Sequence, residues 1–220
     1  MSDAETVEIR YDDASLVAVV AQDHLTGEVR MVAYANAEAV KKTLEIGLAT
    51  FYSRSRSALW TKGESSGNTM RVARVLVDCD ADCLLYLVEP SGPTCHTGAP
   101  SCFFRTLDGA EPTAPTTLIA RLEATIEARK AATAEASYVK SLFAKGGETI
   151  GDKVREEAAE LAHAITSEED ARVVSEAADV LFHVMVGLSS RGLTMRAVLA
   201  ELARRSGTSG HDEKRARSSR

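Results

Sequence analysis

The chain has 220 residues, of which 45% are hydrophobic and 26% are charged, and its formal net charge at pH 7 is −6. This globular balance suits one large domain or two small ones, at roughly 100–200 residues per domain, and it excludes a disordered or collagen-like chain. The negative charge argues against a general nucleic-acid-binding role.

We expect a cytoplasmic protein without a membrane span or a signal peptide. No apolar run approaches the roughly 18 residues of a membrane-spanning helix. The first residues, MSDAETVEIRYDD, are acidic and lack the basic and then apolar layout of a signal peptide. All four cysteines fall between positions 79 and 102. In a reducing compartment, such clustering indicates metal binding before disulfides.

The first half alternates strand-like and helix-like segments. Two β-like apolar runs in 16–32 surround a turn at Thr26-Gly27, which predicts a hairpin. Apolar residues at helical spacing in 37–47 predict a helix that ends at Gly47. A strand-like segment, a polar loop and two apolar runs follow at 51–53, 62–68, 72–77 and 84–88. We therefore expect an α+β domain with a mostly antiparallel sheet over 1–112.

The composition changes at residues 108–117, where DGAEPTAPTT contains two of the five prolines and no large apolar residue. Such a segment is typical of an interdomain linker. Beyond it, apolar residues recur every three or four positions in four stretches, at 118–136, 150–165, 171–187 and 195–205. This period predicts an all-α helical bundle over 113–206, and the polar residues 207–220 predict a flexible tail.

Three aspartates alternate in the string DCDADC, directly after a strand-like run. Alternate side chains of an extended segment point to one side, so Asp78, Asp80 and Asp82 would share a face. Cys79 would then point to the other side. Three neighbouring carboxylates repel one another unless a hard cation joins them, and Mg²⁺ suits oxygen ligands. We therefore expect a magnesium site at these aspartates.

Cys95 and Cys102 lie in the loop GPTCHTGAPSC, where glycines and prolines force turns. Together with Cys79 they would offer three thiolates, which suit Zn²⁺, and would leave its fourth position open to water. Such an open site is typical of catalysis, because bound zinc generates hydroxide at neutral pH. His96 would act there as a general acid or base. A structural zinc half-site completed by His96 or Cys83 is the alternative.

Three strings carry a family resemblance: FYSRSRSALWTKGESSGN at 51–68, DCDADCLL at 78–85 and GPTCHTGAPSCF at 92–103. They resemble the phosphoribosyl-AMP cyclohydrolases, which open the adenine ring of their substrate in histidine biosynthesis. The resemblance implies zinc on the three cysteines and magnesium on the three aspartates. In that family the zinc ligands come from two subunits, so the resemblance also implies an obligate homodimer.

Ring opening requires water to add to C6 of the N1-substituted adenine, after which the C6–N1 bond breaks. Zinc hydroxide would supply that nucleophile. The phosphates and ribose hydroxyls of the substrate need cationic and hydrogen-bonding partners. The candidates for these contacts are Arg54, Arg56, Lys62, Gly63, Ser66 and Asn68.

Acidic residues also gather in the second half. Glu156, Glu157 and Glu160 lie within one turn of a predicted helix, and on the next predicted helix Glu176 and Asp179 lie one turn apart. Clustered carboxylates on facing helices are not buried as bare charge, so we expect divalent cations. Ligation by oxygen alone favours Mg²⁺ over iron. A solvated helix face, neutralised by neighbouring lysine and arginine, is the alternative.

The strings SYVKSLFAKGGETIGDKV at 137–154, KVREEAAEL at 153–161 and EAADVLFH at 176–183 resemble phosphoribosyl-ATP pyrophosphatase. This family belongs to the all-α nucleoside-triphosphate pyrophosphohydrolases. The resemblance implies Mg²⁺ on the five acids and hydrolysis between the α and β phosphates. Lys145 and Lys153 would contact the phosphates.

Together the two resemblances imply a bifunctional hydrolase of histidine biosynthesis that uses Zn²⁺ and Mg²⁺. The second domain would remove pyrophosphate from phosphoribosyl-ATP, and the first would open the ring of the resulting phosphoribosyl-AMP. Two rival functions stay open. One is a zinc-stabilised interaction module on a helical dimerisation bundle, and the other is a nucleotide deaminase joined to a dNTP pyrophosphatase.

Overall fold

The computed structural model describes residues 7–108, 117–131 and 138–206. It divides into two compact units, Met1–Thr117 and Leu118–Arg220, and each is described by itself. Most of the expected linker, residues 109–116, and the whole of the expected tail, residues 207–220, lie outside the described residues.

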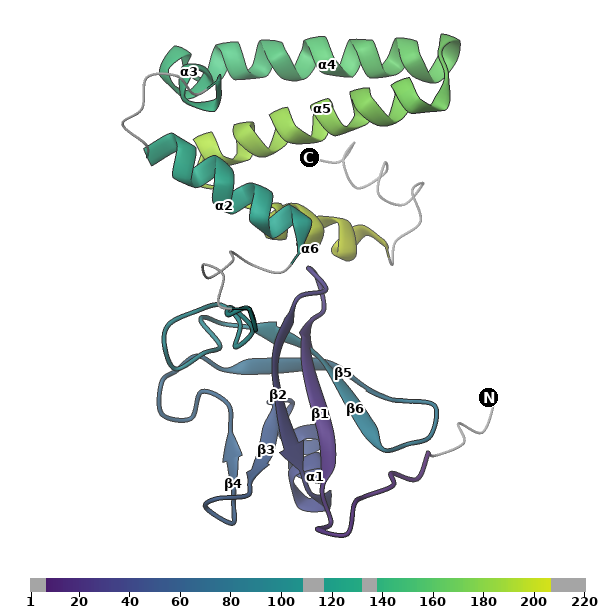
Figure 1. Cartoon of the computed structure of the whole chain (residues 1–220), viewed down its shortest axis with the longest axis vertical. Coiled ribbons are helices and arrows are strands. Elements are labelled where there is room, and N and C mark those ends of the chain that lie inside the picture. Colours follow the sequence, from purple (N-terminus) through teal and green to yellow (C-terminus); the bar gives the residue numbers. More distant parts are fainter. Residues whose placement is uncertain (1–6, 109–116, 132–137, 207–220) are drawn as a thin grey trace, which may run out of the picture. The chain divides into compact units, whose positions relative to one another are not determined.

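The first unit contains a six-stranded sheet and one helix (Figure 1). Its elements are β1 (Val17–Asp23), β2 (Val29–Ala35), α1 (Ala37–Ile46), β3 (Thr50–Ser53), β4 (Ala58–Thr61), β5 (Met70–Val77) and β6 (Cys83–Pro90). The strand order is β4-β3-β2-β1-β6-β5. The expected α+β domain with a mostly antiparallel sheet is confirmed, with one correction. The interior pair β1–β6 is parallel, which makes the sheet mixed.

The core of this unit follows from the alternation of side chains along the strands. Every second residue of β1 is buried, from Val17 to Asp23, and β6 shows the same pattern from Leu84 to Val88. Because alternate side chains point to the same face, the two strands present one buried face. Phe51 stacks there on Tyr86, with ring centres 5.9 Å apart.

The predicted hairpin and the predicted first helix are also confirmed. β1 pairs with β2 through the turn that contains Gly27, whose φ is 71°. Helix α1 begins after Asn36, whose side chain accepts a hydrogen bond from the backbone N–H of Ala39. It ends at Gly47 in the left-handed conformation, which glycine adopts without a steric penalty. The sequence analysis missed β4.

The second unit is all helical, as expected. Its helices are α2 (Leu118–Ala131), α3 (Tyr138–Lys145), α4 (Gly147–Ser167), α5 (Asp170–Ser190) and α6 (Met195–Ser206). The sequence analysis did not identify α3 as a helix. Apolar side chains from all five elements form the buried core, namely Ile126, Val139, Leu142, Ile150, Met185, Val186 and Met195.

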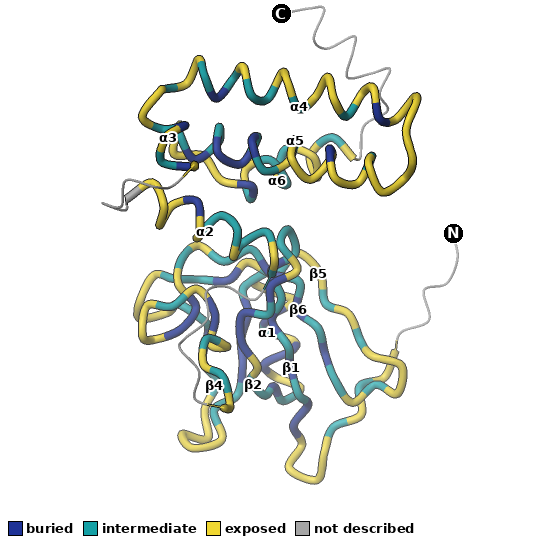
Figure 2. The backbone as a smooth tube through the Cα atoms, turned by 45° about the horizontal axis from the view of Figure 1, so that its top comes forward, coloured by how far each residue is buried: buried dark blue, intermediate teal, exposed yellow. Residues whose placement is uncertain are grey.

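Helices α4 and α5 lie side by side and are joined by a short turn at 168–169 (Figure 1). Helix α4 is exposed along most of its length (Figure 2), and Ile150 and Ala164 are its buried residues. Helix α5 buries more of its surface, including the polar side chains of Glu176 and His183. The two longest helices of the unit therefore place acidic side chains along a shared seam.

Among the described residues one helix, α5, is long and apolar enough to cross a membrane by length and composition alone. The sequence analysis considered only unbroken apolar runs, and it missed this helix because Glu176 and Asp179 interrupt the apolar residues. The core helix of a soluble protein passes the same test, and Met185 and Val186 of α5 are buried in the core of the unit. This weak signal carries no argument for a membrane.

We predict that Thr43→Val destabilises the first unit by about 1–3 kcal/mol, the cost of a buried donor left without its acceptor. The buried Thr43 hydroxyl of α1 accepts the N–H of Thr50 at 3.0 Å and donates to the Ala39 carbonyl at 2.9 Å. Thr43→Ser keeps this hydroxyl and is the control. Urea unfolding followed by the fluorescence of Trp60, the single tryptophan, measures the effect. Equal stability of the Val variant and the wild type would contradict the prediction.

Candidate active sites

A cavity of ≈ 450 Å³ lies between the loop that joins β4 to β5 and the loop that follows β6. Six of the residues expected to serve ring opening line it, namely Lys62, Ser66, Asn68, Cys95, His96 and Cys102. Glycines with positive φ shape both loops, including Gly67 and Gly98. The two sequence strings that are farthest apart in the first unit therefore meet at one cavity.

Cys95 and Cys102 both line this cavity, and they lie close enough for each thiol to shift the pKa of the other. Hydrogen bonds from Thr97 lower the pKa of the Cys95 thiol. Burial raises the pKa of the Cys102 thiol, and the charge of Cys95 raises it further, whereas Lys62 lowers it. The pair therefore favours a thiolate on Cys95, and the thiolate is the form of cysteine that binds a metal ion.

His96 lies next to this pair and is exposed. Its Nδ1 is 3.9 Å from the Sγ atom of Cys95. The loop closes on itself, because the N–H of Cys95 donates to the Ala99 carbonyl at 3.0 Å and the N–H of Thr94 donates to the Pro100 carbonyl at 3.3 Å. The imidazole is thus held beside the thiols and in contact with solvent.

Cys79 does not join these thiols within one chain. It lies in the turn between β5 and β6, whereas Cys95 and Cys102 follow the other end of β6. The eight residues of β6 span about 25 Å at roughly 3.3 Å per residue. Cys79 is exposed. The structure of a single chain therefore brings together two of the three expected zinc ligands.

The carboxylates of Asp78, Asp80 and Asp82 do cluster, with oxygen atoms within 4.8 Å of one another. The expected reason for this clustering is wrong. The segment is not extended, because it forms a turn between β5 and β6 in which Ala81 has a φ of 63°. The turn, and not strand alternation, places the three exposed side chains together.

Arg10 binds this aspartate turn. Its guanidinium donates hydrogen bonds to Asp80 and Asp82, each at 3.0 Å, and its backbone N–H donates to the Ala81 carbonyl at 2.7 Å. Sequence reasoning missed Arg10, because it lies 70 residues before Asp80 and no local pattern links the two. These contacts are exposed, so they contribute little to stability but place a positive charge on the acidic turn.

Arg54 and Arg56 are not among the described residues that line the cavity. The guanidinium of Arg54 lies 4.1 Å from the ring centre of Tyr34, in a cation–π contact. The Nε atom of Arg56 donates to the hydroxyl of Ser53 at 3.3 Å. Both arginines therefore have contacts near β3 that do not involve the cavity.

The second unit holds a carboxylate cluster between α4 and α5. Oxygen atoms of Glu157, Glu176 and Asp179 lie within 4.8 Å of one another. Burial raises the pKa of the Glu176 carboxyl, and the charges of Glu160 and Asp179 add to the rise. Glu176 is 2% exposed, and its Oε2 has no hydrogen-bond partner among the described residues. A buried carboxylate oxygen without a donor fits a cation ligand.

The other expected acids of α4 lie at the edge of this cluster. Arg172 links Glu160 to Glu176, because its Nη2 lies 3.9 Å from Glu160 and 2.6 Å from Glu176. Glu156 is half exposed and pairs with Lys153 at 2.8 Å, and Lys153 also lies 3.4 Å from Glu157. The structure therefore does not bring Glu156 into the cluster. Lys153 lies between Glu156 and Glu157 and so connects Glu156 to the cluster indirectly.

The two expected phosphate contacts of this unit lie near the start of α4. Lys145 is exposed and is the last residue of α3. Gly146, with a φ of 89°, turns the chain so that α4 begins at Gly147. Lys153 follows within the first two turns of α4. Lys145 is therefore exposed beside the start of α4, and Lys153 contacts the cluster through Glu157.

Sequence reasoning missed Arg172 and Tyr138. Arg172 pairs with Glu176 at 2.6 Å across one turn of α5, and the spacing of four residues was the available signal. Tyr138 has its hydroxyl 2.9 Å from Nε2 of the buried His183, whose Nδ1 lies 2.9 Å from the Asp179 carbonyl. Because a carbonyl only accepts, Nδ1 carries a proton. These contacts link α3 through His183 to the backbone of Asp179, whose carboxylate belongs to the cluster.

Comparison with known proteins separates the chain into the same two parts. Residues 31–104 match the family model of phosphoribosyl-AMP cyclohydrolase, and residues 119–206 match that of phosphoribosyl-ATP pyrophosphohydrolase. The histidine biosynthesis bifunctional protein HisIE of Aquifex aeolicus is 43% identical over 202 residues, which cover 90% of this chain and 98% of that protein. The protein of the same name from Deinococcus radiodurans is 45% identical over 205 residues, which cover 92% and 94%.

We predict that Gly63→Ala destabilises the first unit by more than Gly67→Ala does. Both glycines have a positive φ, so alanine at either position meets a conformational cost of about 1–2 kcal/mol. A Cβ atom at Gly63 would also lie 2.4 Å from the backbone nitrogen of Thr69, whereas at Gly67 it would meet open space. Urea unfolding followed by Trp60 fluorescence compares the two variants. A smaller loss for Gly63→Ala would show that the loop is not packed as described.

Proposed function

The chain belongs to the family of bifunctional histidine-biosynthesis proteins that join a phosphoribosyl-AMP cyclohydrolase to a phosphoribosyl-ATP pyrophosphohydrolase, and we propose that it performs both hydrolyses with bound zinc and magnesium. The second unit removes pyrophosphate from phosphoribosyl-ATP. The first unit then hydrolyses the adenine ring of phosphoribosyl-AMP between N1 and C6. The reactions therefore run in the opposite order to the domains.

The observation that carries the zinc proposal is that Cys95, Cys102 and His96 line one cavity. Thiolates suit zinc, and the pair already favours one thiolate. Zinc bound there would lower the pKa of a water molecule to near neutrality and so supply the nucleophile for C6 of the adenine.

The residues around this position would handle the substrate and its protons. When the C6–N1 bond breaks, N1 takes up a proton and the attacking water loses one, and His96 is placed to carry it. Lys62 donates one hydrogen bond to the Asn68 carbonyl at 3.3 Å, so its ammonium has two further N–H groups for a phosphate. Ser66 and Asn68 would bind the ribose and phosphate oxygens from the same loop.

We further propose that Cys79 completes the zinc site from a second copy of the chain. About 25 Å of strand separates it from Cys95 in its own chain. In a two-fold symmetric homodimer the same contact occurs twice, so each cavity would receive Cys79 of the partner subunit. Asp78, Asp80 and Asp82 lie in the same turn and would bring magnesium with them, where it would meet the substrate phosphate.

In the second unit, Glu157, Glu160, Glu176 and Asp179 would bind magnesium. The buried oxygen of Glu176 that lacks a donor supports this, because a divalent cation would compensate its charge. Magnesium there would neutralise the triphosphate and favour attack of water between the α and β phosphates. Lys153 would hold Glu157 in place, and Glu156 would join through the same lysine.

The cellular setting follows from these activities. Both substrates are soluble nucleotides, and the net charge of −6 offers no general attraction for nucleic acid. We propose that the protein works in the cytoplasm without a membrane or nucleic-acid partner. Mass spectrometry of phosphoribosyl-ATP incubated with the zinc- and magnesium-loaded protein tests the whole scheme. It should show loss of pyrophosphate and then gain of one water, and absence of both events would contradict the scheme.

We predict that Cys79→Ser and Cys95→Ser each abolish ring opening but leave pyrophosphate release intact. Co-expression of the two variants should restore about a quarter of the wild-type ring-opening activity, because half of the dimers are mixed and each of these has one complete site. The assay follows hydrolysis of phosphoribosyl-AMP supplied directly. Cys83→Ser, which changes a cysteine without a proposed ligand role, is the control and should keep full activity. No recovery in the mixture would exclude a site shared between subunits.

We predict that Glu176→Gln lowers pyrophosphate release by about 100-fold, because the amide keeps the shape of the side chain but removes a metal ligand. Hydrolysis of phosphoribosyl-AMP should be unchanged. Glu148→Gln alters an exposed acid in the first turn of α4 and is the matched control. Pyrophosphate release assayed over a magnesium titration measures both variants. Wild-type activity of Glu176→Gln at low magnesium would contradict the proposed site.

A further inference from the structure

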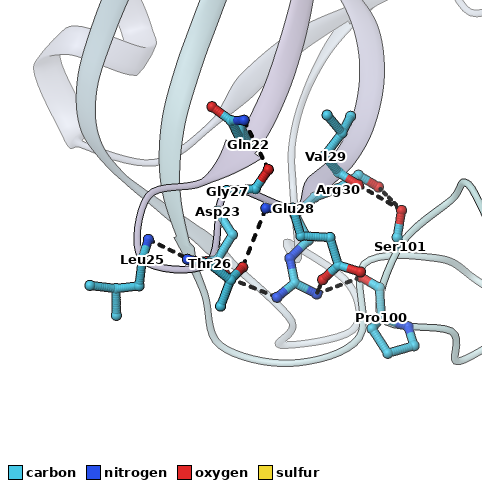
Figure 3. A network of polar contacts seen from close by, with 10 residues as sticks. All are labelled: Gln22, Asp23, Leu25, Thr26, Gly27, Glu28, Val29, Arg30, Pro100 and Ser101. Carbon is cyan, nitrogen blue, oxygen red and sulfur yellow. Dashed lines mark hydrogen bonds and ion pairs between the residues drawn. The ribbon is translucent and has the colours of Figure 1, made fainter. Parts of the chain in front are cut away.

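Arg30 of β2 is a buried cation that no step of the proposed chemistry uses. Its side chain is 10% exposed, and it lies between the buried carboxylates of Asp23 and Glu28 (Figure 3). Its Nη2 donates to Asp23 at 2.7 Å, and its Nη1 lies 3.1 Å from a carboxylate oxygen of Glu28. Burying a charge is costly unless it is paired, so this arrangement needs all three side chains.

The end of the β1–β2 hairpin makes this anchor rigid. The carboxylate of Asp23 accepts the backbone N–H groups of Leu25 and Thr26, at 3.0 Å and 3.2 Å. The N–H of Gly27 donates to the Asp23 carbonyl at 2.9 Å. Because the turn fixes the carboxylate, it also fixes the guanidinium of Arg30 that binds to it.

The same arginine reaches the loop that follows β6. Its Nη1 donates to the Pro100 carbonyl at 3.1 Å, and the N–H of Thr94 donates to the same carbonyl. The backbone carbonyl of Arg30 accepts the N–H of Cys102 at 2.8 Å. One guanidinium and one backbone carbonyl therefore hold both arms of the loop, the arm before Cys95 and the arm that ends at Cys102.

A second contact ties the loop to β2. The hydroxyl of Ser101 donates to the Val29 carbonyl at 2.7 Å (Figure 3). It also accepts the N–H of Phe103 at 3.0 Å. The Ser101 hydroxyl and the Cys102 N–H both bind backbone carbonyls of β2, and these two contacts hold only the arm of the loop after Pro100. The Pro100 carbonyl accepts the N–H of Thr94, which lies in the arm before Cys95. Among the described contacts, the guanidinium of Arg30 is the side-chain group that binds this carbonyl.

We propose that Arg30 is a positioning residue: by tying the β1–β2 hairpin to the loop after β6, it fixes the spacing of Cys95 and Cys102. The inference rests on the proposed zinc site. Groups that orient the ligands of a metal contribute about 10–100-fold to its affinity, because the ion tolerates little error in ligand position. The planar fork of arginine suits this role, since it donates to several acceptors at once, whereas the ammonium of lysine is a single point.

The test uses the full-length protein with Arg30→Met and Arg30→Lys. Two readouts apply: backbone hydrogen exchange of residues 92–103 in the metal-free protein, and zinc affinity by competition with a chelator. Thr43→Val is the control for general loss of stability in the same unit, because Thr43 does not contact the loop. Arg71→Met removes an exposed ion pair with Glu89 and controls for the lost charge. Pyrophosphate release by the second unit reports that each chain is intact.

Arg30→Met should bind zinc about 10–100-fold more weakly and exchange faster in the loop, while both controls bind zinc as the wild type does. Arg30→Lys keeps a charge for the carboxylates, so it should fold and should show a smaller loss of both readouts. If Arg30→Met does not fold, the zinc affinity and hydrogen exchange of Arg30→Lys decide whether Arg30 positions the loop. Unchanged zinc affinity in a folded Arg30 variant, or an equal loss in Thr43→Val, would overturn the inference. If the wild type bound no zinc, the proposed site would fail, whereas the exchange data would still show whether Arg30 holds the loop.

Discussion

The position of β6 between β1 and β5 fixes where the candidate metal ligands of the first unit lie. One end of this strand follows the turn with Cys79 and the three aspartates, and the other end leads into the loop with Cys95 and Cys102. A paired strand cannot fold back on itself, so the two groups of ligands stay apart in one chain. If the proposed zinc site uses both groups, it requires two chains, and assembly would then be a condition of ring opening.

The same sheet explains how the cysteine loop is held. Because β1 is parallel to β6 and antiparallel to β2, the hairpin between β1 and β2 lies at the end of the sheet where β6 leads into the loop. The buried Asp23 and Arg30 at that end belong to the fold, yet their hydrogen bonds extend to Pro100. The position of the thiols is thus linked to a rigid hairpin by buried charged groups.

Clustered negative charge recurs in both units, and arginine lies beside it each time. Arg10 binds the aspartate turn, and Arg172 pairs with the buried Glu176. Carboxylates held together repel one another, so a folded chain needs positive charge beside them. An arginine at the edge lowers this cost and leaves part of the cluster unsatisfied, as the Oε2 atom of Glu176 shows. A divalent cation would complete the compensation that each arginine begins.

The sequence by itself determined the local features of this protein. The period of apolar residues gave the hairpin, α1 and four helices of the second unit, because such patterns depend on neighbours a few residues apart. The sequence also contains the strings with cysteines and acids that mark the two hydrolase families. Only the tertiary structure decided which groups meet: that Cys79 lies far from Cys95, that Glu156 stays outside the cluster around Glu176, and that Arg10 and Arg30 bind partners 70 residues away. Such pairs depend on strand order and on turns such as that at Ala81, and no local spacing encodes them.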